Sequence, residues 1–151
     1  MTVVNRLGPA VTRFVREQRV ARLATVDAEG RPHVVPVVFA YAAGRLYTPL
    51  DLKPKAAQPD KLRRVLNIRA NPRVQVLVDR YDEDWSRLAY VQLRGTAELI
   101  EEGTDYRRAV RLLEEKYPQY QALPLDGRPV IRVTVEQAVT WGALPGRGAR
   151  R

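Results

Sequence analysis

Residues 73–79 read Arg-Val-Gln-Val-Leu-Val-Asp, with an apolar side chain at every second position. The longer stretch Leu88–Ile100 repeats this pattern, and Val91 and Leu93 are among its apolar positions. Alternation with a period of two is typical of a β-strand that turns one face toward a core. Gly95 interrupts the second stretch, and we expect a β-bulge there. These two segments predict long strands of a sheet that is buried on one side.

Four further segments have the character of strands, namely 20–26, 31–41, 45–50 and 130–136. The first three are joined by short turns, which favours antiparallel pairing. Pro36 indicates an edge strand or a bulge, because proline cannot donate a hydrogen bond to a ladder. Helical spacing is found in three other segments, 9–18, 59–68 and 105–117. About six strands with interspersed helices predict a mainly β fold, an antiparallel barrel with peripheral helices.

The length and composition limit the function. A chain of 151 residues predicts a single domain, which we place at residues 1–143, followed by a basic tail at 144–151. The chain has no cysteine, and its only histidine and serine are His33 and Ser86. Thiolate nucleophiles, thiolate zinc sites and multi-histidine metal sites are therefore excluded, and we expect no metal site. If the protein is an enzyme, a bound cofactor is expected to carry the chemistry.

The formal net charge is +9, which favours anionic partners. Arginine supplies most of this charge, and part of that excess can reflect genomic base composition. No run approaches 18 consecutive apolar residues, and the N-terminus lacks the pattern of a signal peptide. We therefore expect a cytoplasmic protein that does not bind a membrane.

Three of the four lysines, Lys53, Lys55 and Lys61, lie within nine positions and are followed by Arg63 and Arg64. The spacing over 59–68 predicts that Leu62, Val65 and Leu66 face inward as an apolar stripe. The two arginines and Asn67 are expected to lie on the other side of the helix. Together with the amide groups of a helix N-terminus, these cations would form an anion site. The alternative is an ordinary solvated basic face. Genomic base composition does not account for lysines gathered in a chain that otherwise avoids them.

Two more residues have both a functional and a structural interpretation. Trp85 follows the acidic residues 82–84, where an aromatic ring could pack on a flat ligand or a partner chain, or simply on its own loop. His33 precedes an apolar strand and is more often a hydrogen-bonded structural residue than a catalyst at such a place. No catalytic residue can be assigned from the sequence.

Several motifs resemble a known superfamily. Ala21–Val26 and Gly30–Val37 are similar to the opening of the pyridoxamine-phosphate-oxidase-like superfamily. Asp51–Lys55, Leu62–Val74 and Val78–Trp85 resemble, more narrowly, the PPOX-class enzymes that depend on coenzyme F420. The resemblance implies a split β-barrel of the FMN-binding type. It also implies a homodimer that binds a flavin or deazaflavin in a groove between its subunits.

The same resemblance implies cofactor-binding roles for particular residues. The strand that carries His33, Val35, Pro36 and Val37 would line the ring, with Tyr47 and Thr48 beneath it. Basic residues would contact the phosphate or the glutamate tail, with Asn67 one turn further on; these are Lys53, Lys55, Lys61, Arg63 and Arg64. Trp85 matches a tryptophan near the ring that could reach the partner's cofactor. The C-terminal Trp and Arg pattern of true pyridoxamine-phosphate oxidases is missing.

These features lead to a hypothesis with three alternatives. The first is an oxidoreductase that transfers a hydride between coenzyme F420 and a small molecule, since a polyanionic deazaflavin suits a basic protein. A protein that uses FMN and a protein that binds a flavin without turnover are the next alternatives. A basic barrel that binds nucleic acid ranks third, because no aromatic residue lies between Asp51 and Arg80 to stack on bases. We expect no nucleic-acid partner.

Overall fold

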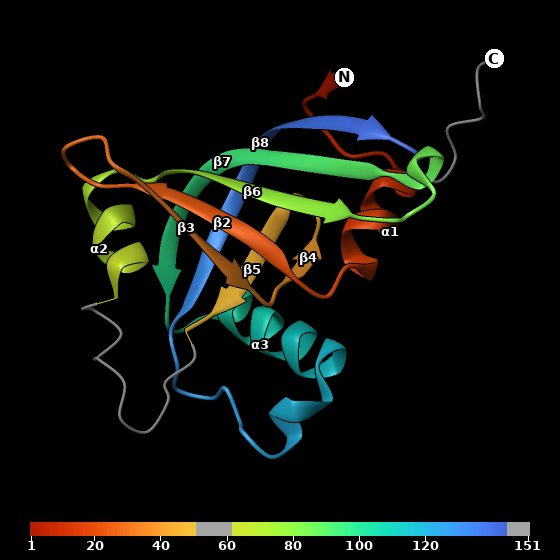
Figure 1. Ribbon diagram of the computed structural model, residues 1–151. Helices are drawn as coiled ribbons and strands as arrows, with labels where there is room; N and C mark the ends of the chain where they lie inside the picture. Colours follow the sequence, from red (N-terminus) through yellow and green to blue (C-terminus); the bar gives the residue numbers. More distant parts are fainter. Residues whose placement is uncertain (51–61, 145–151) are drawn as a thin grey trace.

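A computed structural model describes residues 1–50 and 62–144 of the chain (Figure 1). The first part contains β1 (Thr2–Val4), α1 (Pro9–Glu17), β2 (Ala21–Val26), β3 (Pro32–Val37), β4 (Ala40–Ala42) and β5 (Arg45–Pro49). The second part contains α2 (Arg63–Ala70), β6 (Arg73–Arg80), the 3-10 turn η2 (Trp85–Arg87), β7 (Ala89–Ile100), α3 (Thr104–Lys116), the 3-10 turn η3 (Pro118–Gln121) and β8 (Val130–Gly142).

The strands form one antiparallel sheet in the order β3-β2-β6-β7-β8-β5-β4, and β1 pairs with the far end of β8. The sheet curls into a split barrel with the helices outside it (Figure 1). The mainly β, antiparallel prediction is confirmed, although the described residues form eight strands rather than six. The additional strands are β1 and β4, each three residues long. Segment 31–41 is divided into β3 and β4, and β3 is an edge strand, as Pro36 predicted.

The predicted bulge at Gly95 is present, and glycine is required there. The β7–β8 register shifts between Arg94 and Gly95. A Cβ atom at Gly95 would overlap the carbonyl oxygen of Thr134 and would lie 2.9 Å from its carbonyl carbon. Beyond the bulge β8 continues to Gly142, so the prediction that this strand ends at Glu136 is wrong.

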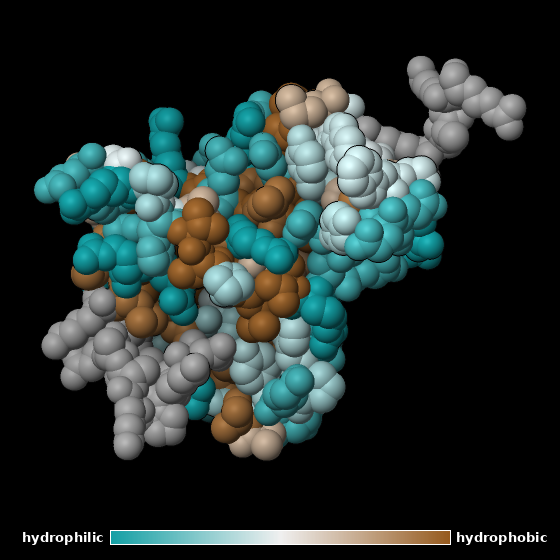
Figure 2. Space-filling view, viewed as in Figure 1, coloured by the Kyte–Doolittle hydropathy of each residue, from teal (hydrophilic) through white to brown (hydrophobic). Residues whose placement is uncertain are grey.

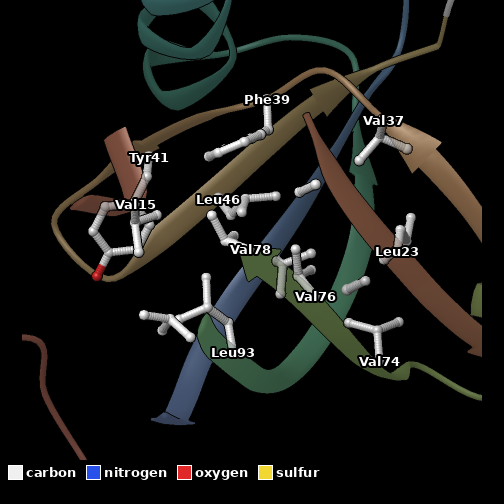
Figure 3. Close-up of a cluster of buried hydrophobic side chains, with 14 of the residues drawn as sticks. Val15, Leu23, Val37, Phe39, Tyr41, Leu46, Val74, Val76, Val78 and Leu93 are labelled. Carbon is white, nitrogen blue, oxygen red and sulfur yellow. The ribbon is translucent and has the colours of Figure 1, made fainter. Parts of the chain in front are cut away.

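The barrel interior is filled by aliphatic and aromatic side chains from both halves of the sheet. In Figure 3, Leu23, Leu46, Val76 and Leu93 point toward one another from β2, β5, β6 and β7. All four are fully buried. Leu144 also packs in this core, so the ordered fold continues one residue past the expected boundary at 143. Residues 145–151 of the expected tail lie outside the described residues.

A second core lies between α3 and the outer side of β5 (Figure 1). Tyr47 is fully buried in it, and its hydroxyl donates a hydrogen bond of 2.8 Å to Asp105 Oδ1. Arg132 and Arg45 form ion pairs with the other carboxylate oxygen, at 2.8 and 3.1 Å. Burial opposes ionisation of Asp105, but these two arginines and the Tyr47 hydroxyl lower its pKa overall. In the described part of the chain, each helix is too short or too polar to cross a bilayer.

Candidate functional site

Helix α2, which carries Arg63, Arg64 and Asn67 of the predicted site, packs against β2 and β7. Leu62 caps its N-terminus, Arg63 is its first residue and is exposed, and Val65 and Ile68 are buried against the barrel. The predicted orientation of the helix is partly wrong, because Asn67 is only 1% exposed whereas Leu66 is 41% exposed. The helix is rotated so that its polar residue, rather than Leu66, faces the sheet.

A hydrogen bond accounts for this orientation. Asn67 Nδ2 donates to Thr25 Oγ1 at 3.0 Å, and Thr25 is itself buried on β2. His33 lies directly opposite Thr25 in the β2–β3 ladder, so both side chains are on the face that α2 covers. Asn67 Oδ1 has no hydrogen-bond partner among the described residues. A buried acceptor without a partner costs about 1–3 kcal/mol, which partly offsets the stabilisation from the bond to Thr25.

Four of the predicted site residues meet in one small cavity between β3, β5 and α2. These are Pro36, Val37, Thr48 and Arg64. The cavity has a volume of about 190 Å³, and its other lining residues are Val20, Val38 and Pro49. Apolar walls with one hydroxyl and one guanidinium are suited to the edge of a flat ring carrying an anionic group. The sequence reasoning missed Val38 and Pro49, although each directly follows a residue that it had selected.

The two faces of β3 divide the other predicted residues. His33, Val35 and Val37 alternate on the face that turns toward the barrel, and Val35 packs partly against its core. Pro36 and Val34 lie on the opposite face, and Val34 is 60% exposed. Figure 2 shows hydrophobic side chains gathered in the middle of the visible face of the molecule.

Tyr47 does not line this cavity. Neighbouring residues of a strand point to opposite faces, so Thr48 faces the cavity while Tyr47 faces α3. Burial raises the pKa of the Tyr47 hydroxyl, and its bond to Asp105 raises it further. In this structure the hydroxyl therefore belongs to the second core rather than to a ring-binding surface.

Trp85 lies at the opposite end of the sheet from Arg64. Strand β6 starts beside α2 and ends at Arg80, just before the turn that carries Trp85 (Figure 1). Its eight residues span roughly 25 Å at about 3.3 Å per residue. Trp85 is 72% exposed, and Asp84 fixes its turn by accepting hydrogen bonds from the Ser86 backbone and hydroxyl. One chain therefore does not bring this ring to the α2 cavity.

Lys53, Lys55 and Lys61, the lysines of the predicted basic site, lie outside the described residues. Another cavity, of about 750 Å³, is lined by residues before and at the start of α1, by the β4–β5 turn and by β8. It contains none of the predicted site residues. Within residues 1–50 and 62–144, no three acidic or histidine side chains gather as metal ligands.

Comparison with known proteins identifies the family of the chain. The family model described as pyridoxamine 5'-phosphate oxidase matches residues 7–142, nearly the whole chain. The chain therefore belongs to this family. A curated relative, the 5a,11a-dehydrotetracycline/5a,11a-dehydrooxytetracycline reductase of Streptomyces rimosus, is 29% identical over 130 residues, which cover 85% of this chain and 78% of the reductase.

Solved structures share the fold. A conserved hypothetical protein from Mycobacterium tuberculosis superposes with a TM-score of 0.72 at 23% identity, covering 91% of this chain and 86% of the other. A FAD-binding protein from Mesorhizobium loti superposes with a TM-score of 0.65 at 23% identity, covering 93% of this chain and 97% of the other. The heme storage protein HutZ from Vibrio cholerae superposes with a TM-score of 0.68 at 20% identity, covering 91% of this chain and 97% of HutZ. The split-barrel prediction is confirmed by these likenesses.

Proposed function

We propose that this protein is an oxidoreductase that binds coenzyme F420 at the α2 end of its barrel and reduces a small organic molecule. The observation that carries the proposal is the cavity in which Pro36, Val37, Thr48 and Arg64 meet. The similarity to a reductase over 85% of the chain supports a reductive activity. When bound, the deazaflavin would supply the hydride, since the chain has no cysteine and a single histidine.

The residues around the cavity fit such a group. Arg64 offers a guanidinium that can hold a phosphate through charge-assisted hydrogen bonds. Pro36 and Val37 supply an apolar wall that excludes water from a flat ring, and the Thr48 hydroxyl can orient its polar edge. The buried Asn67, through its hydrogen bond to Thr25, holds the helix that carries Arg64 in place against β2. By sequence, Lys53, Lys55 and Lys61 would add further positive charge to the phosphate or the glutamate tail.

One chain supplies only part of this site. Its cavity of about 190 Å³ is smaller than the roughly 300–1,000 Å³ of ordinary ligand pockets. We therefore include in the proposal a homodimer whose second subunit closes the site. Exposed Val34 on the edge strand and exposed Trp85 at the far end are suited to such a contact. In this arrangement Trp85 of one chain would approach the cofactor held by Arg64 of the other.

Titration tests cofactor binding. Purified protein is titrated with coenzyme F420 and, separately, with FMN, and binding is followed by fluorescence at two salt concentrations. We expect a Kd for coenzyme F420 below about 100 μM, weakened by salt because the contacts are charged. Tighter binding of FMN would favour the flavin alternative. The absence of binding by both would contradict the proposal.

A pair of arginines on one helix provides a matched control. Arg64→Ala should weaken binding by about 10- to 100-fold, since a charge-assisted contact contributes about 1.5–3 kcal/mol. Arg69→Ala, on the exposed last turn of α2, removes the same charge away from the cavity and should change binding less than about threefold. Lys55→Ala should behave like Arg64→Ala, with little change in thermal stability. Equal effects of the Arg64 and Arg69 changes would mean that only overall charge matters.

Mixing subunits tests the shared site. Dimers of Arg64→Ala and dimers of Trp85→Ala should each bind weakly. After subunit exchange, a mixed dimer carries one site with both changes and one intact site, so tight binding should return at about a quarter of all sites. If Arg64 and Trp85 acted on the same cofactor within one chain, no intact site would form.

A further inference from the structure

Lys116, at the C-terminal end of α3, has an unusual environment. Its Nζ atom is buried and has no hydrogen-bond partner among the described residues. It lies 3.8 Å from the centroid of the Phe39 ring and 5.4 Å from that of Tyr117. An ammonium group deprived of hydrogen bonds is costly, even above an aromatic face. The environment therefore makes the ammonium form less stable than it is in water.

The positive charges around Lys116 also disfavour its protonated form. Arg16 faces it from α1, and Arg19, from the segment between α1 and β2, donates a hydrogen bond of 2.9 Å to the Lys116 carbonyl oxygen. Glu115 is the acidic residue that lines the same place. Burial, followed by repulsion from Arg19 and Arg16, lowers the pKa of Lys116 from 10.5 to about 8.

The lysine also lines a cavity of about 220 Å³, separate from the proposed cofactor site. Its lining residues are Arg16, Ala40, Tyr41, Leu112, Glu115 and Lys116. Because Lys116 is a lining residue of this cavity and its side chain is long and flexible, rotation about its side-chain bonds is the movement that would bring the amine from the Phe39 ring into the space. Space of this size holds a molecule of a few heavy atoms beside the amine.

We propose that Lys116 is a nucleophilic amine that condenses with small anionic carbonyl compounds, of the 2-oxo acid or carboxy-aldehyde class, in this cavity. The nitrogen lone pair attacks the carbonyl carbon, and the carbonyl oxygen takes up a proton to give a carbinolamine. Loss of water then leaves a carbon–nitrogen double bond, with no net oxidation or reduction. Desolvation and neighbouring cations are the features that activate lysine amines. Arg16 provides the counter-charge for the carboxylate of the compound.

Reductive trapping of the imine with cyanoborohydride tests the proposal. The protein is incubated at pH 7 with glyoxylate and cyanoborohydride, which reduces the imine to a stable secondary amine, and each lysine is then quantified by peptide mass spectrometry. A pKa of about 8 leaves about 10% of the amine neutral at pH 7, against about 0.03% for an ordinary lysine. An amine of lower pKa is also a somewhat weaker nucleophile, which reduces this advantage. We therefore expect Lys116 to react at least about tenfold faster than Nα-acetyllysine in the same tube.

Two variants distinguish a reactive site from simple packing. Lys116→Arg keeps a cation above Phe39 and should remove the fast labelling while the protein stays folded. Arg16→Gln should slow labelling by glyoxylate more than labelling by the neutral aldehyde propanal, because only glyoxylate uses the guanidinium. If a variant does not fold, the labelling rate of Lys116 in the wild-type protein, compared with that of Nα-acetyllysine, still decides the question. Labelling of Lys116 no faster than the reference amine would overturn the proposal, and so would equal slowing of both aldehydes by Arg16→Gln.

Discussion

Replacing Gly95 with serine tests the bulge on which the β7–β8 ladder depends. A Cβ atom there would overlap the carbonyl oxygen of Thr134 and would lie 3.2 Å from the Val135 Cα. Both belong to the backbone of a central strand, so neither can move aside as a side chain could. Overpacking of this kind costs about 1–3 kcal/mol and occasionally more, and a contact with backbone belongs at the upper end. We expect a loss of about 3 kcal/mol, or about 6–12 °C in Tm.

The same substitution at Gly8 is the matched control. Gly8 caps α1 with ordinary extended backbone, and a Cβ atom there would meet nothing within 4 Å. Serine is a good N-cap, so Gly8→Ser should leave the free energy of unfolding unchanged or raise it by a few tenths of a kcal/mol. Urea unfolding followed by circular dichroism measures both variants. Gly95→Ser within about 1 kcal/mol of Gly8→Ser would refute the close approach of the two strands.

Three other variants test the second core and Lys116. Tyr117→Phe removes the hydroxyl that accepts from the Phe39 amide at 3.1 Å, and urea unfolding should show a loss of about 1–3 kcal/mol because that buried amide stays unpaired. Asp105→Asn removes a carboxylate whose lowered pKa stabilises the fold above pH 3.8, so its stability difference from wild type should shrink as the pH falls below that value; a constant difference would contradict this sign. Since the folded pKa of Lys116 is the lower one, wild-type stability should rise with pH from about 8 toward 10, and Lys116→Met should flatten that rise in thermal denaturation.

The features that were predictable from sequence have purely local causes. Pro36 lacks an amide hydrogen, so it indicated an edge strand or a bulge, and β3 is at the edge. Gly95 breaks a long alternating run and indicated a bulge, which is present. In both cases the backbone chemistry of one residue determines how a strand can pair.

The features that were missed depend on a distant partner. The apolar stripe of α2 did not predict a buried Asn67, because the Thr25 hydroxyl that satisfies its amide lies 42 positions away. The end of β8 was missed for a similar reason. After the bulge the alternation is lost, and three consecutive residues, Ala138, Val139 and Thr140, are all buried where β1 and β7 flank the strand.

Among the described residues, the buried Asn67 amide donates to Thr25 while its oxygen has no partner, whereas an aliphatic residue would have filled the same space without an unsatisfied polar group. The other buried positions of α2, Val65 and Ile68, are aliphatic. The unpaired oxygen lies on the helix that also carries Arg64 into the cavity beside β3 and β5. The hydrogen bond from Asn67 to Thr25 ties α2 to β2 and so holds the helix that places Arg64 at the cavity, which accounts for a polar residue at this buried position.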